Sequence, residues 1–191
     1  MGKLRRRVDA ERAYSIPLTH RHRGLLDRGG DDFKSLNDVD GHAAGDLALK
    51  SLAATLLANA MAYDIVSRYG GEEFLVLFPG IDSATASAAC DRFRSGIAAG
   101  TEAVLPRGRA ITVSVGIADM NSVSPPATGT DGDADDDAPR AGRHGAGAEA
   151  IIEAMLRNAD AALYKAKAAG KNRCLVHDAS TGDAGIHGEG R

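Results

Sequence analysis

The stretch RYGGEEFLVLF, from Arg68 to Phe78, places two glycines and two glutamates side by side in front of an apolar run. Glu72 and Glu73 repel each other unless a cation or hydrogen-bond donors compensate them, while Gly70 and Gly71 let a bulky ligand approach the backbone. Mg²⁺, or Mn²⁺ in its place, suits such carboxylates, because Mg²⁺ takes one or two and completes its shell with water and phosphate oxygens. The turn is therefore a candidate site for a metal-bound triphosphate; the alternative is a Gly-Gly hairpin with a solvated acidic tip.

A second group of polar residues lies in FKSLNDVDGHAAGD, from Phe33 to Asp46. Asn37, Asp38, His42 and Asp46 fall in a turn-rich stretch that runs into a helix. An amide beside a carboxylate can read guanine, because the amide donates to its carbonyl and the carboxylate accepts from its ring N–H and amine. The alternative is an Asx-turn followed by a helix cap.

Lys167 and Lys171 form a third candidate group, one helical turn apart at the end of the last predicted helix. At this spacing two ammonium groups share one face and can meet phosphate. The alternative is that both cations satisfy the C-terminal end of the helix dipole.

Hydrophobic periodicity predicts the elements that position these residues. Leucines at helical spacing predict a helix over 45–60 with Asp46 at its start, and the runs 64–69 and 74–78 predict a hairpin whose turn carries the glutamates. The remaining expectations are a helix that Asp82 caps and Gly100 ends, a strand over 109–118, a helix over 150–170 closed by Gly170, and a strand over 172–177.

This order of elements predicts an α+β domain, an antiparallel-rich sheet covered by helices. The domain is expected to span 14–178, after an N-terminal extension over 1–13. Residues 121–148 are rich in Ser, Pro, Gly, Ala and Asp and predict a disordered insertion, and 179–191 predict a disordered tail.

Composition narrows the class of protein. The chain has 191 residues, of which 43% are hydrophobic and 4% aromatic, and its net charge of −3 offers no basic field for nucleic acid. The basic start has no apolar segment after it and no later stretch is long enough to cross a bilayer, so a soluble cytoplasmic protein without membrane contact is expected. Cys90 and Cys174 lack metal or CxxC spacing and are expected as buried thiols rather than as a disulfide.

Taken together, RYGGEEF, FKSLNDVDGHAAGD, ITVSVGIA and NADAALYKAKAAGKNR resemble the GGDEF domain, the catalytic domain of diguanylate cyclases. The resemblance covers Phe33 to Asp119 and Ile151 to Val176. It implies a nucleotide-cyclase-like fold, with a ferredoxin-like or palm sheet, in which two GTP-loaded subunits meet as a homodimer. Each 3′-hydroxyl attacks the other α-phosphate, which yields cyclic di-GMP and pyrophosphate.

The resemblance also implies roles for individual residues. Asn37 and Asp46 would read guanine, and His42 would support the substrate site. Gly70 and Gly71 of the hairpin would also contact the substrate. Glu72 would be the key metal ligand and base, with Glu73 beside it. The phosphate groups would meet Lys34, Lys167, Lys171 and Arg68.

The chain departs from the family pattern at two places. The family has a long apolar first strand that ends in Asp-x-Asp-x-Phe-Lys, whereas here LLDRGGDDFK puts Gly29 at the first Asp and the preceding 17–28 resembles the family's entry helix. We infer that the central strand is shortened or missing, unless Leu25 and Leu26 form a stunted strand, and that Asp27 or Asp31 would have to supply the lost carboxylate.

The second departure lies at the family's product-inhibition site, an Arg-x-x-Asp pattern that here reads Met61 to Asp64. Methionine offers no hydrogen-bond donor and no charge, so tight binding of cyclic di-GMP is not expected there. Two functions stay open: an active diguanylate cyclase, or a degenerate domain that binds GTP or a protein partner without turnover.

Overall fold

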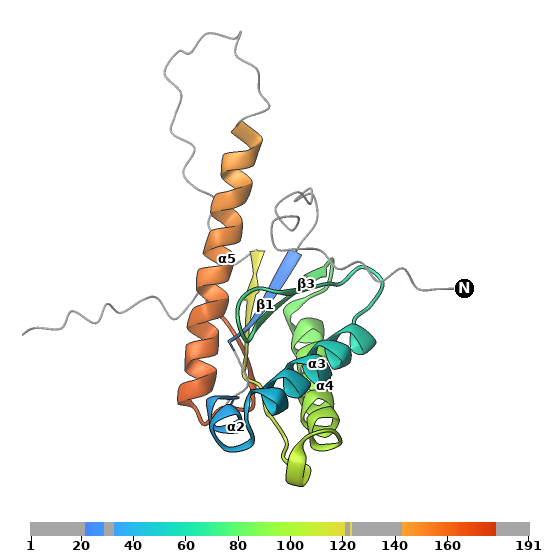
Figure 1. The fold of residues 1–191 in the computed structure, drawn as a ribbon. Helices are drawn as coiled ribbons and strands as arrows, with labels where there is room; N and C mark the ends of the chain where they lie inside the picture. Colours follow the sequence, from blue (N-terminus) through green and yellow to red (C-terminus); the bar gives the residue numbers. More distant parts are fainter. Residues whose placement is uncertain (1–21, 29–32, 121–122, 124–142, 179–191) are drawn as a thin grey trace, which may run out of the picture.

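The computed structural model describes residues 22–28, 33–120, 123 and 143–178. Within them the chain forms a five-stranded sheet and four α-helices (Figure 1). The elements in chain order are β1 (His22–Arg28), α2 (Phe33–Asp40), α3 (His42–Asn59), β2 (Ile65–Arg68), β3 (Glu73–Pro79), α4 (Ser83–Glu102), the 3₁₀ turn η1 (Pro106–Gly108), β4 (Val115–Asp119), α5 (Arg143–Ala168) and β5 (Cys174–Val176).

The strands lie in the order β2-β3-β1-β4-β5, so β1 is the central strand of the sheet. It pairs antiparallel with β3, where Asp27 lies opposite Phe74, and antiparallel with β4, where Leu26 lies opposite Gly116. Among the described strands only β4 and β5 pair in parallel, and α5 forms the crossover between them. The expected loss of the central strand is therefore wrong. The alternative of a short strand around Leu25 and Leu26 is what the structure contains.

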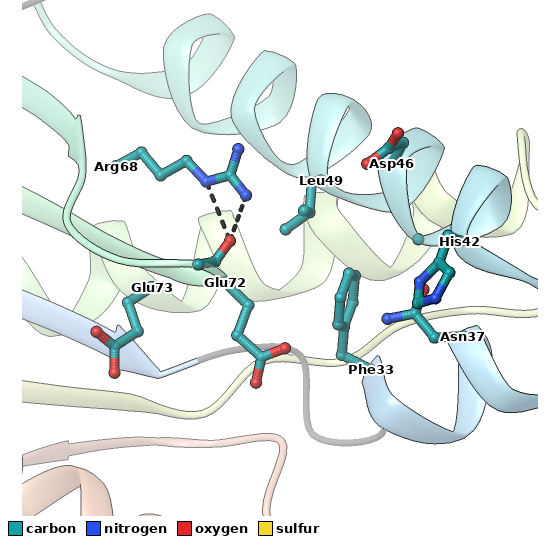
Figure 2. A pocket seen from close by; sticks show the side chains of 10 residues that line it. Phe33, Asn37, His42, Asp46, Leu49, Arg68, Glu72 and Glu73 are labelled. Atoms are coloured by element: carbon teal, nitrogen blue, oxygen red, sulfur yellow. Dashed lines mark hydrogen bonds between the residues drawn. The ribbon is translucent and has the colours of Figure 1, made fainter.

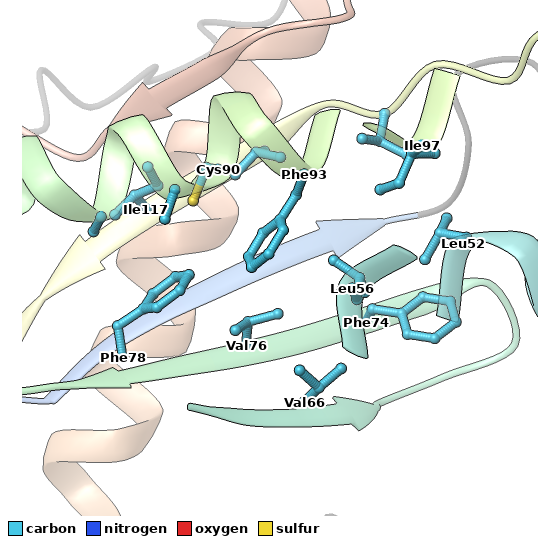
Figure 3. Close-up of a cluster of buried hydrophobic side chains, with 14 residues drawn as sticks. Leu52, Leu56, Val66, Phe74, Val76, Phe78, Cys90, Phe93, Ile97 and Ile117 are labelled. Carbon is cyan, nitrogen blue, oxygen red and sulfur yellow. The ribbon is translucent and has the colours of Figure 1, made fainter. Parts of the chain in front are cut away.

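Helices cover both faces of the sheet, with α3 and α4 on one side and α5 on the other (Figure 1). Alternate residues of β3 serve the two faces, because side chains alternate along a strand: Phe74, Val76 and Phe78 pack with α3 and α4, whereas Leu75 packs with α5. Figure 3 shows the larger cluster, in which the rings of Phe78 and Phe93 stack with centroids 6.0 Å apart. The expected α+β class is confirmed. The strands are apolar because helices bury both faces of the sheet.

The segment expected as turn-rich is a helix followed by a sharp corner. Residues 33–40 form α2, in which Leu36 is fully buried, and Gly41 then separates α2 from α3. Gly41 has a φ of 81°, a conformation that favours glycine, and its N–H donates to the carbonyl of Asn37 at 3.0 Å. A second, smaller core cluster packs against this corner and consists of Leu36, Ala44, Ala48, Leu105 and Ile111.

Several expected element ends need correction. Asp82 caps α4 by accepting from the N–H of Thr85, as predicted, but α4 continues past Gly100 to Glu102. Gly100 is instead a packing residue, because a Cβ there would lie 3.1 Å from Thr55 Oγ1 on α3. The predicted strand over 109–118 begins only at Val115, since the N–H of Ile111 donates to Thr101 Oγ1 at 2.9 Å instead of to a strand.

The last helix begins earlier than expected. α5 starts at Arg143, so the end of the predicted insertion 121–148 is helical, and it ends before Gly170, whose φ is 107°. The rest of that insertion, apart from residue 123, lies outside the described residues, as do the extension 1–13 and the tail 179–191.

The two cysteines are free thiols, as predicted. Cys90 is buried and Cys174 is half-buried against the same core cluster. A hydrogen bond with the Cys174 side chain and then burial raise the pKa of the Cys90 thiol far above its usual range.

Candidate functional site

A pocket of about 550 Å³ opens between the α2–α3 corner and the β2–β3 hairpin (Figure 2). Figure 2 shows the glutamates of the hairpin on one side, Asn37 and His42 on the other, and Phe33 with Leu49 between them. The lining residues are Phe33, Asn37, His42, Gly45, Asp46, Leu49, Arg68, Gly71, Glu72 and Glu73. Two motifs separated by a long helix in the sequence therefore meet in one cavity.

Helical periodicity explains the wall that α2 and α3 form. His42, Asp46 and Leu49 recur at spacings of four and three residues and so share one face of α3. Asn37 reaches this face from α2 because Gly45 has no side chain. A Cβ at Gly45 would overlap Asn37 Oδ1 and would lie 3.1 Å from both Asn37 Cγ and Phe33 Cζ.

The hairpin turn is closed by backbone hydrogen bonds and by an arginine. The carbonyl of Glu73 accepts from the N–H of Tyr69 at 2.8 Å and from that of Gly70 at 3.3 Å. Arg68 Nε donates to the carbonyls of Gly71 at 3.1 Å and Gly70 at 3.3 Å, and its Nη2 also donates to Gly71. Arg68 thus holds the turn together, while its expected contact with phosphate stays a prediction.

The two glycines of the turn differ in what surrounds them. A Cβ at Gly70 would lie 2.5 Å from Glu73 Oε2, so the absence of a side chain makes room for that carboxylate. At Gly71 nothing lies within 4 Å of the same position, and Gly71 lines the pocket. Open backbone for a ligand is therefore found at Gly71, whereas Gly70 accommodates the neighbouring glutamate.

Not every predicted site residue lines this pocket. Lys34, Gly70, Lys167 and Lys171 are absent from the lining, although Lys34 follows Phe33 directly. Lys171 has a φ of 59°, in the turn that joins α5 to β5. Their roles at phosphate stay predictions.

The donor set of the hairpin fits a hard cation that shares its coordination with a ligand. Glu72 and Glu73 supply carboxylate oxygens, which is the chemistry Mg²⁺ prefers, and Mg²⁺ needs only one or two of them when phosphate oxygens complete its shell. Within the described part of the chain, no group of three or more His, Cys, Asp or Glu residues could hold a metal ion. Asp27 lies in β1 opposite Phe74, the residue that follows Glu73 in β3. Asp31 lies outside the described residues.

Sequence reasoning missed Phe33 and Leu49 as members of the site. Both line the pocket between its polar walls and offer an apolar surface to a flat ligand. A signal was present, because Phe33 precedes Asn37 by four residues and Leu49 follows Asp46 by three, the spacings that place residues on one helical face.

A smaller pocket of about 320 Å³ lies at the position of the expected product-inhibition motif. Met61 and Asp64 line it, and Asp64 Oδ2 accepts the N–H of Met61 at 2.7 Å, so this carboxylate closes a local turn. Arg92 from α4 also lines this pocket and was not recognised from the sequence. The weak binding of cyclic di-GMP at this place stays a prediction.

Membrane insertion by a helix finds no support in the described residues, where no helix combines the length and the apolar character needed to cross a bilayer. A cytoplasmic location stays a prediction.

Comparison with known proteins shows the family of this chain. The sequence profile described as "Diguanylate cyclase, GGDEF domain" matches residues 6–146. The chain is similar to the response regulator PleD of Caulobacter vibrioides, with 34% identity over 145 residues, or 74% of this chain and 26% of that protein. It is also similar to the diguanylate cyclase DgcM of Escherichia coli, with 36% identity over 146 residues, or 76% of this chain and 28% of that protein. It thus spans about a quarter of the length of these curated relatives.

Solved structures agree with the sequence comparison. The active GGEEF domain of a diguanylate cyclase from Vibrio cholerae matches with a TM-score of 0.62 and 26% identity, covering 84% of this chain and 85% of that one. The GGDEF domain of DgcB from Caulobacter crescentus in complex with c-di-GMP matches with a TM-score of 0.59 and 26% identity, covering 82% and 77%. The expected family and cyclase-like fold are therefore confirmed: the chain belongs to the GGDEF domain family.

Proposed function

We propose that this chain is a diguanylate cyclase domain, which condenses two GTP molecules into cyclic di-GMP and pyrophosphate. The observation that carries the proposal is a single pocket with Asn37 and Asp46 in one wall and Glu72 in the other. This arrangement matches a nucleoside triphosphate, which presents a hydrogen-bonding base at one end and several negative charges at the other.

The α2–α3 wall is the proposed guanine side. The Asn37 amide donates to the guanine carbonyl, and the Asp46 carboxylate accepts from the ring N–H and the exocyclic amine. Phe33 and Leu49 contribute apolar surface for the base. His42, one helical turn before Asp46, supports the same wall.

The hairpin is the proposed phosphate side. Glu72 and Glu73 would hold Mg²⁺ or Mn²⁺, with Asp27 or Asp31 as an additional ligand, and the bound metal would polarise the phosphoryl group and acidify the attacking hydroxyl. Glu72 also takes the proton of the 3′-hydroxyl as this group attacks the α-phosphate of the other GTP. The charge on the leaving pyrophosphate is neutralised by Lys34, Arg68, Lys167 and Lys171.

The reaction needs a second copy of the chain, because one pocket holds only one of the two reacting nucleotides. A homodimer with facing pockets supplies both. Specific activity is therefore expected to rise with protein concentration.

The test is incubation of the pure protein with labelled GTP and Mg²⁺, following cyclic di-GMP formation and nucleotide retention together across a dilution series. Glu72→Ala should abolish turnover, whereas Asp46→Ala should weaken GTP binding by roughly 1–3 kcal/mol or more, because it leaves guanine donors unpaired. Turnover that survives Glu72→Ala, or specific activity that stays flat on dilution, would contradict the proposal.

The second candidate function is a degenerate domain that binds GTP or a protein partner without turnover. Gly29 at the position of a metal-binding Asp favours it. Retention of GTP without any cyclic di-GMP at high protein concentration would decide for this candidate.

A further inference from the structure

A buried carboxylate outside the pocket holds the α2–α3 corner against another part of the chain. The side chain of Asp40, the last residue of α2, is only 6% exposed. Its Oδ1 lies 3.6 Å from Arg107 Nη1 and its Oδ2 lies 3.5 Å from Arg109 Nη1, so each oxygen faces a different guanidinium group. Burying a carboxylate is unfavourable unless cations or donors compensate it, and these two arginines do so.

The two arginines come from a connection that is itself anchored. Arg107 lies in η1 and Arg109 follows it, between α4 and β4. The N–H of Ile111 donates to the buried Thr101 Oγ1 at 2.9 Å, which ties this connection to the end of α4. Arg107 has a φ of 60°, a strained conformation for a residue with a side chain, which persists only where the surroundings enforce it.

The same connection packs under the corner. Leu105 and Ile111 are buried with Leu36 of α2 and Ala44 of α3 in the second core cluster. Apolar packing holds the connection and the α2–α3 corner together. The two ion pairs of Asp40 add an electrostatic attraction at the point where α2 ends.

This contact lies close to the proposed guanine side without being part of it. Asp40 is three residues after Asn37 and two before His42, and none of Asp40, Arg107 or Arg109 lines the pocket. We infer that Asp40 is a positioning residue, which with Arg107 and Arg109 fixes the α2–α3 corner and thereby the direction of the Asn37 amide toward the base. The inference rests on the proposed function.

The test compares binding of GTP and of 6-thio-GTP, in which a sulfur, a weak hydrogen-bond acceptor, replaces the guanine carbonyl oxygen, to the full chain and to Asp40→Asn. This variant keeps the size of the side chain and removes its charge. GTP affinity should fall about tenfold, the size of one lost hydrogen bond to the base, and the preference for GTP over 6-thio-GTP should shrink. In turnover assays KM for GTP should rise while kcat at saturation stays within about twofold.

Asp91→Asn is the matched control, because Asp91 pairs with Arg94 at 3.2 Å in a more exposed position on α4. It should leave affinity and preference unchanged. Arg109→Gln should shift both in the direction of Asp40→Asn by a smaller factor, since Asp40 keeps Arg107, and Asp40→Glu should restore part of the preference. Arg109→Gln also keeps the test open if Asp40→Asn does not fold.

An unchanged preference for GTP over 6-thio-GTP in folded Asp40→Asn or Arg109→Gln would overturn the inference, as would an equal loss of affinity for both nucleotides. Asp46→Ala separates this failure from failure of the proposed function. If Asp46→Ala binds GTP like the wild type, the guanine assignment itself is wrong. If Asp46→Ala weakens binding and Asp40→Asn does not, only the positioning role of Asp40 is wrong.

Discussion

Gly45→Ala gives a sharp test of the guanine side, because it should lower nucleotide affinity while changing fold stability little. The added Cβ would overlap Asn37 Oδ1 and would lie 3.1 Å from Asn37 Cγ. Carbon atoms in good contact are about 3.5–4.0 Å apart, so the Asn37 amide has to retreat by roughly 1 Å or more. The amide is the end of a flexible side chain, so it can turn away while the helices keep their places.

The magnitudes of the two effects can be estimated separately. Replacing a helix-interior glycine by alanine gains about 0.5–1 kcal/mol, and an off-rotamer asparagine costs about 0.5–1.5 kcal/mol, so net stability should change by about 1 kcal/mol at most. Loss of the amide hydrogen bond to the base should cost about 1–3 kcal/mol of binding. This corresponds to a GTP dissociation constant about 5- to 150-fold higher.

The assay is titration calorimetry with GTP, paired with urea denaturation of the free protein. Gly100→Ala is the matched control, because Gly100 also lies inside a helix and its Cβ would meet Thr55 Oγ1 at 3.1 Å, far from the pocket lining. In an Asn37→Ala background, Gly45→Ala should cause little further loss, since the group that it displaces is already gone. Wild-type GTP affinity in Gly45→Ala would refute the reasoning, as would an equal loss in both backgrounds.

Three further predictions concern other parts of the fold. Gly116→Ala should destabilise the protein by about 1–3 kcal/mol in urea denaturation, because the added Cβ would lie 2.5 Å from the Leu163 backbone nitrogen of α5. Gly71→Ala is the control and should not destabilise the protein, because the space around Gly71 is open. The free energy of unfolding should fall as the pH rises above 9.0, the ordinary pKa of a cysteine thiol, by about 1.4 kcal/mol per pH unit. The cause is that Cys90 keeps its proton in the folded chain and releases it in the unfolded chain. An equally steep fall in a Cys90→Ala variant would contradict this. Titration calorimetry with cyclic di-GMP should reveal no micromolar binding that Asp64→Ala removes, since the Asp64 carboxylate repels an anionic dinucleotide and already accepts the N–H of Met61.

Much of the site could be predicted from the sequence because its residues lie in regular elements with strong local patterns. The leucine spacing predicted the body of α3 with Asp46 at its start, whereas His42, expected in the turn before it, is the first residue of α3 and so shares a face with Asp46. The hairpin was equally clear, since two apolar runs flank the glycines. Local sequence patterns do not give the distance between α3 and the hairpin. The pocket depends on this distance, because it forms where α3 packs over β3.

The errors have physical causes of their own. β1 has only two strongly apolar residues, Leu25 and Leu26, yet it is a central strand, because backbone hydrogen bonds to β3 and β4 on both edges do not depend on side chains. In α2, Asn37 and Asp38 have the composition of a turn, but burial of Leu36 outweighs that local preference. Tertiary contacts decided both cases.

The register of β1 bears on Asp27, one of the two residues proposed to replace the metal-binding Asp that the sequence is expected to lack. Residues directly opposite each other on antiparallel strands have Cα atoms about 4.5–5.5 Å apart, and Arg28 lies opposite Glu73 with Asp27 opposite Phe74. Asp27 is therefore held beside the start of β3 by the sheet itself, and a shift by one residue would turn each β1 side chain to the other face. Asp31 lies outside the described residues. The fold thus constrains the distance of Asp27 from the glutamate hairpin, and we expect any metal that Glu72 and Glu73 hold to depend on Asp27.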